Sequence, residues 1–437
     1  MCRGAFYYMK KLLKSDFYRS VLTLFTGTAL SQIIPVLASL VLVRLYTEYD
    51  YGVLEMFLKI QAFLVFLSTL RYDMAVPLPK SDKHAFILLN FSFRFNLYFL
   101  MACQVLAIFL FVLNDFLGWG IPQSWIYLFL PITVFFLSLN GQFDNWFTRK
   151  KWYKNITISR VVSAITNNGV KIGLGFLNFS FVGLILGNIV SAFAGAAAFF
   201  GKFRKSKEEY KSYKSKRSQG VLLKKYKDFP LITLPHSISD MTRELVFVAL
   251  TAHFYGWELG AYALTLKLMR APIAFMGSAV GQVYFQKVSN HVANNEGIFA
   301  ITKKTTLQLF ALSIIPFSVL ALFSVEIFTF VLGEDWRESG EFAQILTPWM
   351  FVQFVSSPLS KIPAVLGKQK QFFGISIIAS LVMVLTIWIG GRFYADWSFE
   401  FVLLWISIGQ LIMLLIIVFW IWNLTKKFDK NLIEGRN

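Results

Sequence analysis

Long apolar runs recur along this chain from residue 20 to residue 423, and no other feature constrains its fold as strongly. Hydrophobic residues make up 56% of the 437 residues, whereas Asp, Glu, Lys and Arg together make up only 15%. A soluble domain carries about 25% charged residues, which interrupt its apolar runs. Because about 20 apolar residues in a helix are enough to cross a bilayer, the sequence predicts an all-α polytopic membrane protein.

The apolar runs of spanning length predict twelve transmembrane helices. In the first half they lie at about residues 20–43, 51–70, 86–112, 124–147, 156–177 and 181–200. In the second half they lie at about residues 229–254, 259–286, 305–331, 342–366, 371–391 and 399–423. We therefore predict an N-terminal six-helix lobe (1–200), a basic cytoplasmic linker (201–228) and a C-terminal six-helix lobe with a cytoplasmic tail (229–437).

The positive charges in the loops predict the orientation in the membrane. Loops on the side of the N-terminus carry thirty-two Lys and Arg residues, and loops on the other side carry three. Cytoplasmic loops are the ones enriched in Lys and Arg, so both termini are predicted to be cytoplasmic. This asymmetry accounts for the net charge of +19 without nucleic acid, because basic loops can lie against anionic membrane lipids. Met1 and Met9 both remain open as the start of translation.

Part of the pattern around the second helix returns about two hundred residues later. Gly52 precedes Lys59 by seven residues, and Gly260 precedes Lys267 by the same spacing. Internal repeats with a binding site between them are a common construction of transporters. The sequence therefore predicts two pseudo-symmetric six-helix bundles around a central cavity.

A proline precedes each copy of the repeated pattern. Pro35 and Pro235 lie in the helices that lead into the two copies. A proline in a spanning helix frees backbone groups and kinks the helix. We predict that Pro35 and Pro235 act as hinges.

Eight Lys and Arg residues lie inside the predicted spans, where charge is costly. Arg94, Arg160 and Lys361 lie about two turns from a cytoplasmic helix end, so their side chains can snorkel to the headgroups. The other five lie deeper: Lys59, Lys171, Arg243, Lys267 and Arg270.

Acidic residues accompany some of the deep cations. Glu55 lies four residues before Lys59 on one helical face, and Asp240 and Glu244 lie close to Arg243 in sequence. For these groups a structural salt bridge and a ligand contact are both open alternatives.

Lys267 and Arg270 are three residues apart on one face of their helix, with no acid within about a turn on that helix. They are predicted to meet either an acid from another helix or an anionic ligand in a wet cavity. A phosphate group suits such a cavity, because Arg offers a planar fork for two phosphate oxygens and Lys a point charge.

Catalytic signatures are absent from the sequence. There is no GxGxxG, Walker loop, HExxH or paired cysteine motif, and the four His residues are dispersed. We therefore predict a protein that is not an enzyme and that has no cofactor and no metal site.

The segment LRYDMAVPLPKSDKHA (70–85), which follows GTALSQIIPVLASLVLVRLYTEYDYG (27–52), resembles the O-antigen and polysaccharide flippases. That family belongs to a superfamily with multidrug exporters and the peptidoglycan-precursor flippase. The resemblance is most specific over residues 26–85, and the twelve predicted helices and the turn at 368–370 extend it over nearly the whole chain. The precursor flippase commonly has two further helices, so their absence here favours the polysaccharide branch.

The resemblance implies a substrate and a direction of transport. An oligosaccharide repeat unit linked through pyrophosphate to undecaprenol would move from the cytoplasmic to the periplasmic leaflet of the bacterial inner membrane by alternating access. The product would serve O-antigen, lipopolysaccharide or other surface polysaccharide biosynthesis. A polysaccharide polymerase and a chain-length regulator are further candidate partners.

The resemblance also suggests roles for the charged residues. Pyrophosphate or glycan contact is expected from Lys59, Arg243, Lys267 and Arg270, with Lys171 and Arg160 behind them. Glu55, Asp240 and Glu244 are candidates for coupling to an ion gradient or for setting the electrostatics of the cavity.

Three rival functions stay open. A multidrug or small-molecule exporter of the same architecture should have a net acidic cavity, whereas the deep charges here are five basic and three acidic. A membrane-embedded polysaccharide polymerase or ligase should carry a large periplasmic loop, whereas the longest predicted loop on that side has about ten residues. A scaffold that recruits glycan enzymes through residues 201–228 is the third.

Overall fold

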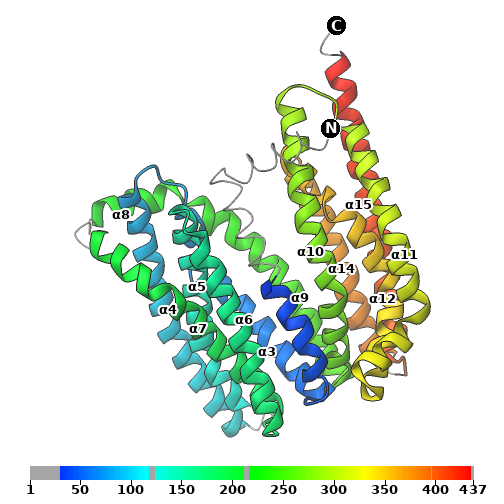
Figure 1. Ribbon diagram of the computed structural model, residues 1–437, viewed down its shortest axis with the longest axis horizontal. Coiled ribbons are helices and arrows are strands. Elements are labelled where there is room, and N and C mark those ends of the chain that lie inside the picture. Colours follow the sequence, from blue (N-terminus) through cyan, green and yellow to red (C-terminus); the bar gives the residue numbers. More distant parts are fainter. Residues whose placement is uncertain (1–29, 118–123, 211–215, 395, 435–437) are drawn as a thin grey trace, which may run out of the picture. The chain divides into compact units, whose positions relative to one another are not determined.

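A computed structural model describes residues 30–117, 124–210, 216–394 and 396–434, apart from a few side chains within these ranges (Figure 1). Every regular element in the described ranges is a helix, which confirms the predicted all-α fold. Six of these helices are long and apolar enough to cross a membrane. The chain is therefore a multi-pass membrane protein, and its first predicted helix is described only from Leu30 to Leu42.

The chain divides into two compact units. The first comprises Met1–Tyr46 and Val53–Leu245, and the second comprises Thr47–Gly52 and Val246–Asn437. The division falls inside two helices, α3 (Glu48–Leu67) and α9 (Leu234–Tyr255). Each of these helices contributes residues to both units.

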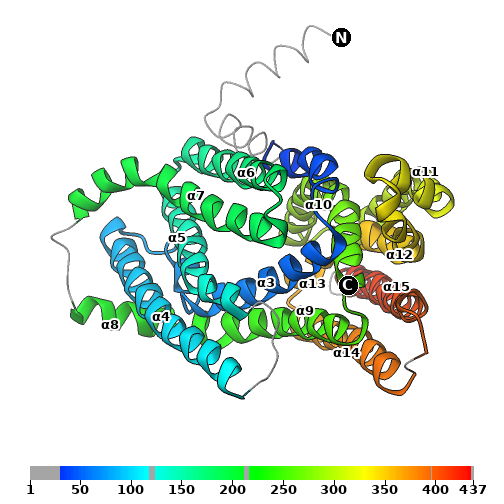
Figure 2. The same cartoon turned by 90° about the horizontal axis from the view of Figure 1, so that it is seen from below.

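The first unit is a bundle of long helices with short connections. After Leu30–Leu42 and α3 it contains η1 (Tyr72–Ala75), α4 (Asp82–Leu117), η2 (Ser124–Phe129), α5 (Leu130–Arg149), α6 (Tyr153–Phe176), α7 (Ser180–Tyr210), α8 (Lys216–Lys225) and the π-helical turn η3 (Phe229–Thr233). Helix α7 packs on α6 and α5, and α8 packs on α4 (Figures 1 and 2). The polar stretch 201–228 is thus largely helical where it is described, because α7 continues to Tyr210 and α8 follows.

Sequence signals define both ends of α3. At its start, the Thr47 backbone N–H and hydroxyl donate to the Asp50 carboxylate at 2.8 and 2.9 Å, and the Asp50 N–H donates back to the Thr47 hydroxyl at 3.3 Å. This reciprocal pair is a capping box, which satisfies amide groups that the first turn leaves unpaired. After Leu67 the helix stops, because Leu70 and Arg71 take the left-handed conformation with φ of 47° and 61°.

Small residues allow α6 and α7 to approach closely. Gly183, Gly187, Ser191 and Gly195 recur every four residues and so line one face of α7. The Ser159 hydroxyl of α6 donates to the Gly195 carbonyl oxygen at 2.8 Å. Close contact through small residues, reinforced by hydrogen bonds, is the usual way helices associate in a membrane, where lipid is as apolar as the helices.

The second unit is also an all-helical bundle. With the last part of α9 it contains α10 (Glu258–Ala293), α11 (Phe299–Leu332), η4 (Glu334–Trp336), α12 (Arg337–Ser356), η5 (Leu359–Lys361), α13 (Ile362–Val365), α14 (Gln369–Phe393) and α15 (Phe399–Glu434). Helix α12 packs on α11, α15 and α10. The predicted helix 342–366 is interrupted after Ser356, where Pro358 and Pro363 cannot donate the backbone hydrogen bonds of a continuous helix.

The two glycines of the repeated sequence pattern lie against each other in this unit. A Cβ atom on Gly260, in the first turn of α10, would lie only 1.7 Å from the Glu48 carbonyl oxygen in the first turn of α3. A Cβ atom on Gly52 would lie 3.5 Å from the Gly260 nitrogen. The repeated glycine therefore permits the first turns of α3 and α10 to cross in direct backbone contact.

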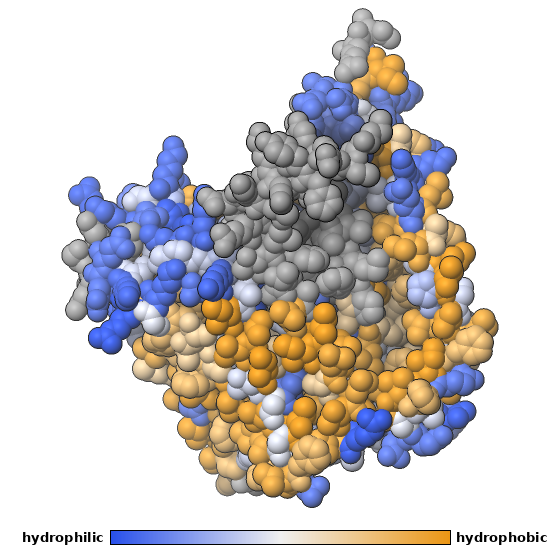
Figure 3. All heavy atoms as spheres, viewed as in Figure 1, coloured by the Kyte–Doolittle hydropathy of each residue, from blue (hydrophilic) through white to orange (hydrophobic). Residues whose placement is uncertain are grey.

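The surface of the first unit follows the expected membrane pattern. In the first unit, hydrophilic residues gather at the end that contains α8, and apolar residues cover the helices beside it (Figure 3). Exposed Val105, Phe109 and Phe116 on α4 illustrate this apolar cover. Such a face is suited to hydrocarbon rather than to water.

Candidate functional site

A charged network on α3 and α9 is the most distinctive polar feature of the first unit. The Lys59 ammonium of α3 lies 3.2 Å from the Glu55 carboxylate one turn earlier and 2.8 Å from the Glu244 carboxylate of α9. Arg243 lies next to Glu244, with 4.0 Å between its guanidinium and the carboxylate. The side chains of Lys59, Glu55, Glu244 and Arg243 are 21%, 23%, 30% and 31% exposed. The predicted Glu55–Lys59 pair is present, and α9 adds a second carboxylate, that of Glu244, to Lys59.

The backbone positions these groups in a simple way. Glu55 and Lys59 are four residues apart on α3, so they lie on one face of the helix. Leu54, Phe57 and Gln61 are buried and form the opposite side, where Gln61 accepts a hydrogen bond from the Asn188 amide of α7 at 2.5 Å. The charged face of α3 is therefore held half-exposed by the packing of its other side. Asp240 lies on α9, but its side chain is outside the part of the structure that is described.

Arg71 joins α3 and α9 at a second point. Its guanidinium donates to the Ser237 hydroxyl of α9 at 3.1 Å and lies over the Phe66 ring, 4.3 Å from its centre. Its Nε is buried without a hydrogen-bond partner among the described residues. Sequence reasoning assigned Arg71 to a loop and did not predict its contact with α9. The left-handed turn after α3, which places Arg71 there, cannot be recognised from the apolar pattern.

Arg160 and Lys171 lie on α6. The Arg160 guanidinium forms an ion pair with the Asp144 carboxylate of α5 at 3.1 Å. The Lys171 carbonyl oxygen accepts a hydrogen bond from the Tyr46 hydroxyl at 2.6 Å, and its side chain packs over Gly187 of α7. Both residues thus contribute to the packing of α5, α6 and α7.

Lys267 and Arg270 lie on α10 in the second unit. The Lys267 side chain is exposed, and Arg270 is half-buried. The Arg270 Nε is buried without a hydrogen-bond partner among the described residues. A buried guanidinium nitrogen with an unused donor can bind an additional acceptor.

The two prolines that the sequence predicts as hinges differ in their surroundings. Pro35 lies inside the helix Leu30–Leu42, whereas Pro235 is the second residue of α9, directly after the π-helical turn Phe229–Thr233. A π-helical turn loosens the regular ladder of backbone hydrogen bonds and often occurs at functional sites. It gives the chain an irregular backbone at the start of α9, the helix that carries Glu244, the partner of Lys59.

Acidic residues also converge at one end of the second unit. Glu48, Glu258 and Glu338 lie in the first turns of α3, α10 and α12, where helices leave the predicted spans. Burial, together with the charges of Glu338, Asp335 and Glu258, raises the pKa of Glu48 to about 8. Burial and the charges of Glu400 and Glu338 raise the pKa of Glu258 to about 7. Sequence reasoning missed this cluster. Its members are far apart in sequence, and acidic residues in loops are expected to be exposed to water.

Comparison with known proteins shows the family to which the chain belongs. The sequence profile of a family described as polysaccharide biosynthesis protein matches residues 41–341. The chain belongs to this family. The match includes all of α3 and α9, and therefore the whole network around Lys59. No curated protein sequence matches the chain significantly.

Solved structures show which fold the chain has. A multidrug resistance MATE family transporter of the MOP superfamily, in an inward-facing conformation, aligns over 91% of this chain and 96% of its own, with a TM-score of 0.67 and 12% identity. The lipid II flippase MurJ, in an inward closed conformation, aligns over 94% of this chain and 90% of its own, with a TM-score of 0.69 and 18% identity. A MOP superfamily transporter from Pyrococcus furiosus aligns over 96% and 98%, with a TM-score of 0.60 and 13% identity. The chain shares the fold of these transporters.

Contacts of Arg149 and Lys150 join the segment 70–85 to the end of α5. The Arg149 guanidinium donates to the carbonyl oxygens of Pro77 and Pro79 at 3.0 and 2.6 Å and to the Asp82 carboxylate at 2.7 Å, and Lys150 also contacts Asp82. Hydrogen bonds to a charged donor are about twice as strong as neutral ones, so these contacts hold the segment firmly. The motif that carries the sequence resemblance therefore has a structural role, in fixing the turn that follows α3.

Among the described residues, no group of three or more His, Cys, Asp or Glu side chains is placed to hold a metal ion. The network around Lys59 can bind an anion in exchange for one of its carboxylates. An arriving phosphate oxygen and a carboxylate compete for the same ammonium, because both are charged acceptors of its hydrogen bonds.

Proposed function

We propose that this protein is a flippase for undecaprenyl-pyrophosphate-linked oligosaccharide repeat units in the biosynthesis of O-antigen or another surface polysaccharide. It would move them from the cytoplasmic to the periplasmic leaflet of the bacterial inner membrane by alternating access. Membership of a polysaccharide biosynthesis family supports this proposal, as does a fold shared with a lipid II flippase. The observation that carries it is the partly exposed ammonium of Lys59, which lies between the Glu55 carboxylate of α3 and the Glu244 carboxylate of α9.

The substrate explains why such a network is needed. A pyrophosphate and a glycan cannot enter hydrocarbon unaided, whereas the polyprenyl tail can remain in lipid. In the proposal the pyrophosphate displaces Glu55 or Glu244 from Lys59. Glu55, Asp240 and Glu244 then couple transport to an ion gradient or set the electrostatics of the cavity.

The other predicted residues complete this proposal. Arg243 contacts the pyrophosphate or glycan together with Lys59. In the second unit, Lys267 and Arg270 are the contacting cations. Lys171 and Arg160 are secondary candidates for this contact. Pro35 and Pro235 are the bending elements, and both termini lie in the cytoplasm. A polysaccharide polymerase and a chain-length regulator are the proposed partners, in addition to the lipid-linked substrate and membrane lipids.

Two other functions make different predictions for a cell that lacks the protein. Loss of a polymerase leaves single repeat units on the cell surface, whereas loss of a flippase leaves no units there and traps lipid-linked glycan on the cytoplasmic side. Loss of a multidrug exporter leaves the surface glycan unchanged and increases the retention of lipophilic cations. The surface glycan of the deletion strain therefore separates the three.

The roles of individual cations can be tested by expressing variants of the protein in that deletion strain. We expect Lys59→Ala, and the double variant Lys267→Ala with Arg270→Ala, to reach the membrane at normal levels but to reduce surface polysaccharide about tenfold or more, because a charge-assisted hydrogen bond contributes about 1.5–3 kcal/mol. Lys154→Gln, which changes an exposed cation in the first turn of α6, is the control and should retain full export. Wild-type glycan levels from both Lys59→Ala and the double variant would remove these cations from the mechanism.

A further inference from the structure

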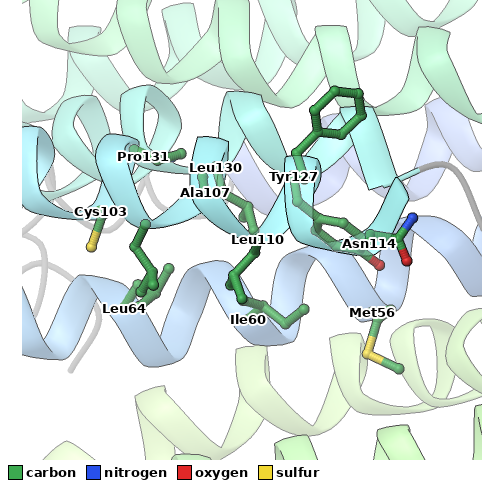
Figure 4. A pocket seen from close by; sticks show the side chains of 12 residues that line it. Met56, Ile60, Leu64, Cys103, Ala107, Leu110, Asn114, Tyr127, Leu130 and Pro131 are labelled. Carbon is green, nitrogen blue, oxygen red and sulfur yellow. The ribbon is translucent and has the colours of Figure 1, made fainter. Parts of the chain in front are cut away.

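An apolar pocket lies in the first unit between α3, α4 and the start of α5 (Figure 4). It encloses about 440 Å³, within the usual range of roughly 300–1,000 Å³ for ligand pockets. Ile60 and Leu64 of α3 face Ala107 and Leu110 of α4 across it, and Met56 of α3 also lines it. Nearly all the lining is hydrocarbon, so the pocket offers water very few hydrogen bonds and suits an apolar occupant.

The position of the pocket determines what can reach it. It lies on α4, which is one of the helices long and apolar enough to span the membrane. Two of its lining residues on α4, Leu106 and Leu110, are 53% and 44% exposed, so the rim of the pocket faces the surroundings of the helix. In a bilayer those surroundings are hydrocarbon chains.

The pocket is elongated. Met56 and Leu64 are eight residues apart along α3, which corresponds to about 12 Å, and Cys103 and Asn114 are eleven residues apart along α4, which corresponds to about 16 Å. The hydrocarbon core is about 30 Å thick, so the pocket runs through roughly half of it. A stretch of hydrocarbon chain fits this length better than a compact ligand does.

The apolar lining and the charged network lie next to each other on α3. At about 100° per residue, the stripe of Met56, Ile60 and Leu64 is centred about 120° from the stripe of Glu55 and Lys59. No buried residue separates them on this side, because the buried Leu54, Phe57 and Gln61 occupy the opposite side of the helix. One half-exposed surface of α3 therefore runs from a charged stripe to an apolar pocket, which is the pattern that an amphiphile with an anionic head requires.

We propose that this pocket holds the isoprenoid units of the substrate's polyprenyl chain that are nearest to the pyrophosphate, while the pyrophosphate lies at Lys59. This inference rests on the proposed function and deepens it. The first isoprenoid units are covalently joined to the head and must lie within reach of it. Lys59 lies eight residues, or about 12 Å, before the end of α3, so a phospholipid whose head stays at the interface cannot occupy both places together.

The pocket acts by packing rather than by hydrophobic transfer. A chain that leaves the bilayer for the pocket exchanges one apolar medium for another, so little affinity comes from the transfer itself. Its contribution is to fix the direction in which the tail leaves the head. The relevant measurement is therefore where the chain lies, rather than how tightly the protein binds lipid.

The test is photo-crosslinking in nanodiscs of phosphatidylethanolamine and phosphatidylglycerol, with the full-length protein and a polyprenyl pyrophosphate that carries a diazirine on an isoprenoid unit near the head. We expect crosslinks on the peptides around Met56–Leu64 and Cys103–Leu110, and competition by unlabelled polyprenyl pyrophosphate. Ala107→Trp, which fills the pocket, should reduce them about tenfold. Val105→Trp is the matched control, because Val105 is 69% exposed, does not line the pocket and lies two residues away on the same helix.

A second variant keeps the test decisive if Ala107→Trp does not fold. Lys59→Gln leaves the pocket intact but removes the anchor of the head, so it should also reduce the pocket crosslinks about tenfold. Unchanged crosslinks in Lys59→Gln, or competition by phosphatidylglycerol as effective as by polyprenyl pyrophosphate, would identify the occupant as an ordinary lipid chain and overturn the inference. Flipping by the wild-type protein in liposomes distinguishes failure of the pocket inference from failure of the proposed flippase function. Flipping without pocket crosslinks contradicts only the pocket, whereas absence of flipping contradicts the proposed function itself.

Discussion

Individual charged residues in this protein have partners that depend on the fold. The Glu55–Lys59 pair follows from their spacing on one helix, and the structure contains it. The contact with Glu244 does not follow from the sequence, because it depends on how α9 packs beside α3. Arg160 shows the same limit, since its partner Asp144 lies on a different helix. Spacing along one helix predicts only the local half of an ion-pair network.

The carboxylates at the end of the second unit give the protein a specific pH dependence. The pKa values of Glu48 and Glu258 are raised to about 8 and about 7, from an ordinary value of 4.5. A carboxyl group whose pKa is raised in the folded state stabilises the fold while it is protonated, and this contribution is lost as the pH rises through the folded-state pKa. The free energy of unfolding should therefore decrease between about pH 6 and pH 9.

The thermal unfolding midpoint in detergent, measured across this range, checks the prediction. We expect the Tm of the wild type to be lower at pH 9 than at pH 6. In the variant Glu48→Gln with Glu258→Gln the decrease should be roughly half as large or less, because two of the titrating groups are gone. Glu326→Gln on α11 is the control and should leave the decrease unchanged. A double variant with the same pH dependence as the wild type would show that these carboxylates are not the cause.

At the scale of helices, the apolar pattern predicts which segments are helical and in what order. It fails at their ends. Helix α4 begins at Asp82 rather than near residue 86, and α15 continues to Glu434 rather than ending near residue 423. Hydrophobicity marks where the membrane ends, whereas a helix continues into water until a breaker stops it, and neither polar segment contains a proline or glycine at that point. The helix breaks near Pro358 and Pro363, whereas Pro316 and Pro348 lie inside the continuous helices α11 and α12, so a proline alone does not determine where a helix ends.

The crossing of α3 and α10 gives a prediction for this scale. Gly260→Ala would place a Cβ atom against the Glu48 carbonyl oxygen, and both are backbone-anchored, so the helices must separate. Overpacking of this kind costs about 1–3 kcal/mol. We expect a lower Tm in detergent and less folded protein in the membrane.

A second glycine on another helix serves as the matched control. Outside its own helix turn, no atom of the described residues lies within 4 Å of the Cβ position of Gly374 on α14. The Tm of Gly374→Ala should be equal to that of the wild type or higher, because Ala favours a helix by up to about 1 kcal/mol over Gly. Equal stability of Gly260→Ala and Gly374→Ala would show that the crossing tolerates a side chain.

For the molecule as a whole, the sequence predicts the class and the family better than it predicts the site. Long apolar runs have few alternatives to membrane helices, and the segment 70–85 resembles one family closely enough for its residues alone to indicate that family. The structure explains this segment as a turn held by Arg149, which sequence reasoning did not foresee. Cations such as Lys59 could be singled out because charge is rare inside spans, but the pocket between α3 and α4 could not, because Met, Ile and Leu are ordinary in a membrane helix.

The function proposed for this protein reduces to one activity, the transfer of a lipid-linked anionic glycan between leaflets through a site that contains Lys59. The most direct test is flipping in liposomes that contain the purified protein and a fluorescent undecaprenyl-pyrophosphate-linked repeat unit, followed by its accessibility to an external reagent. We predict that the wild type makes the inner-leaflet substrate accessible and that Lys59→Ala does so about tenfold more slowly or worse. Folded wild-type protein that moves no substrate, or Lys59→Ala that moves it at the wild-type rate, would contradict this prediction.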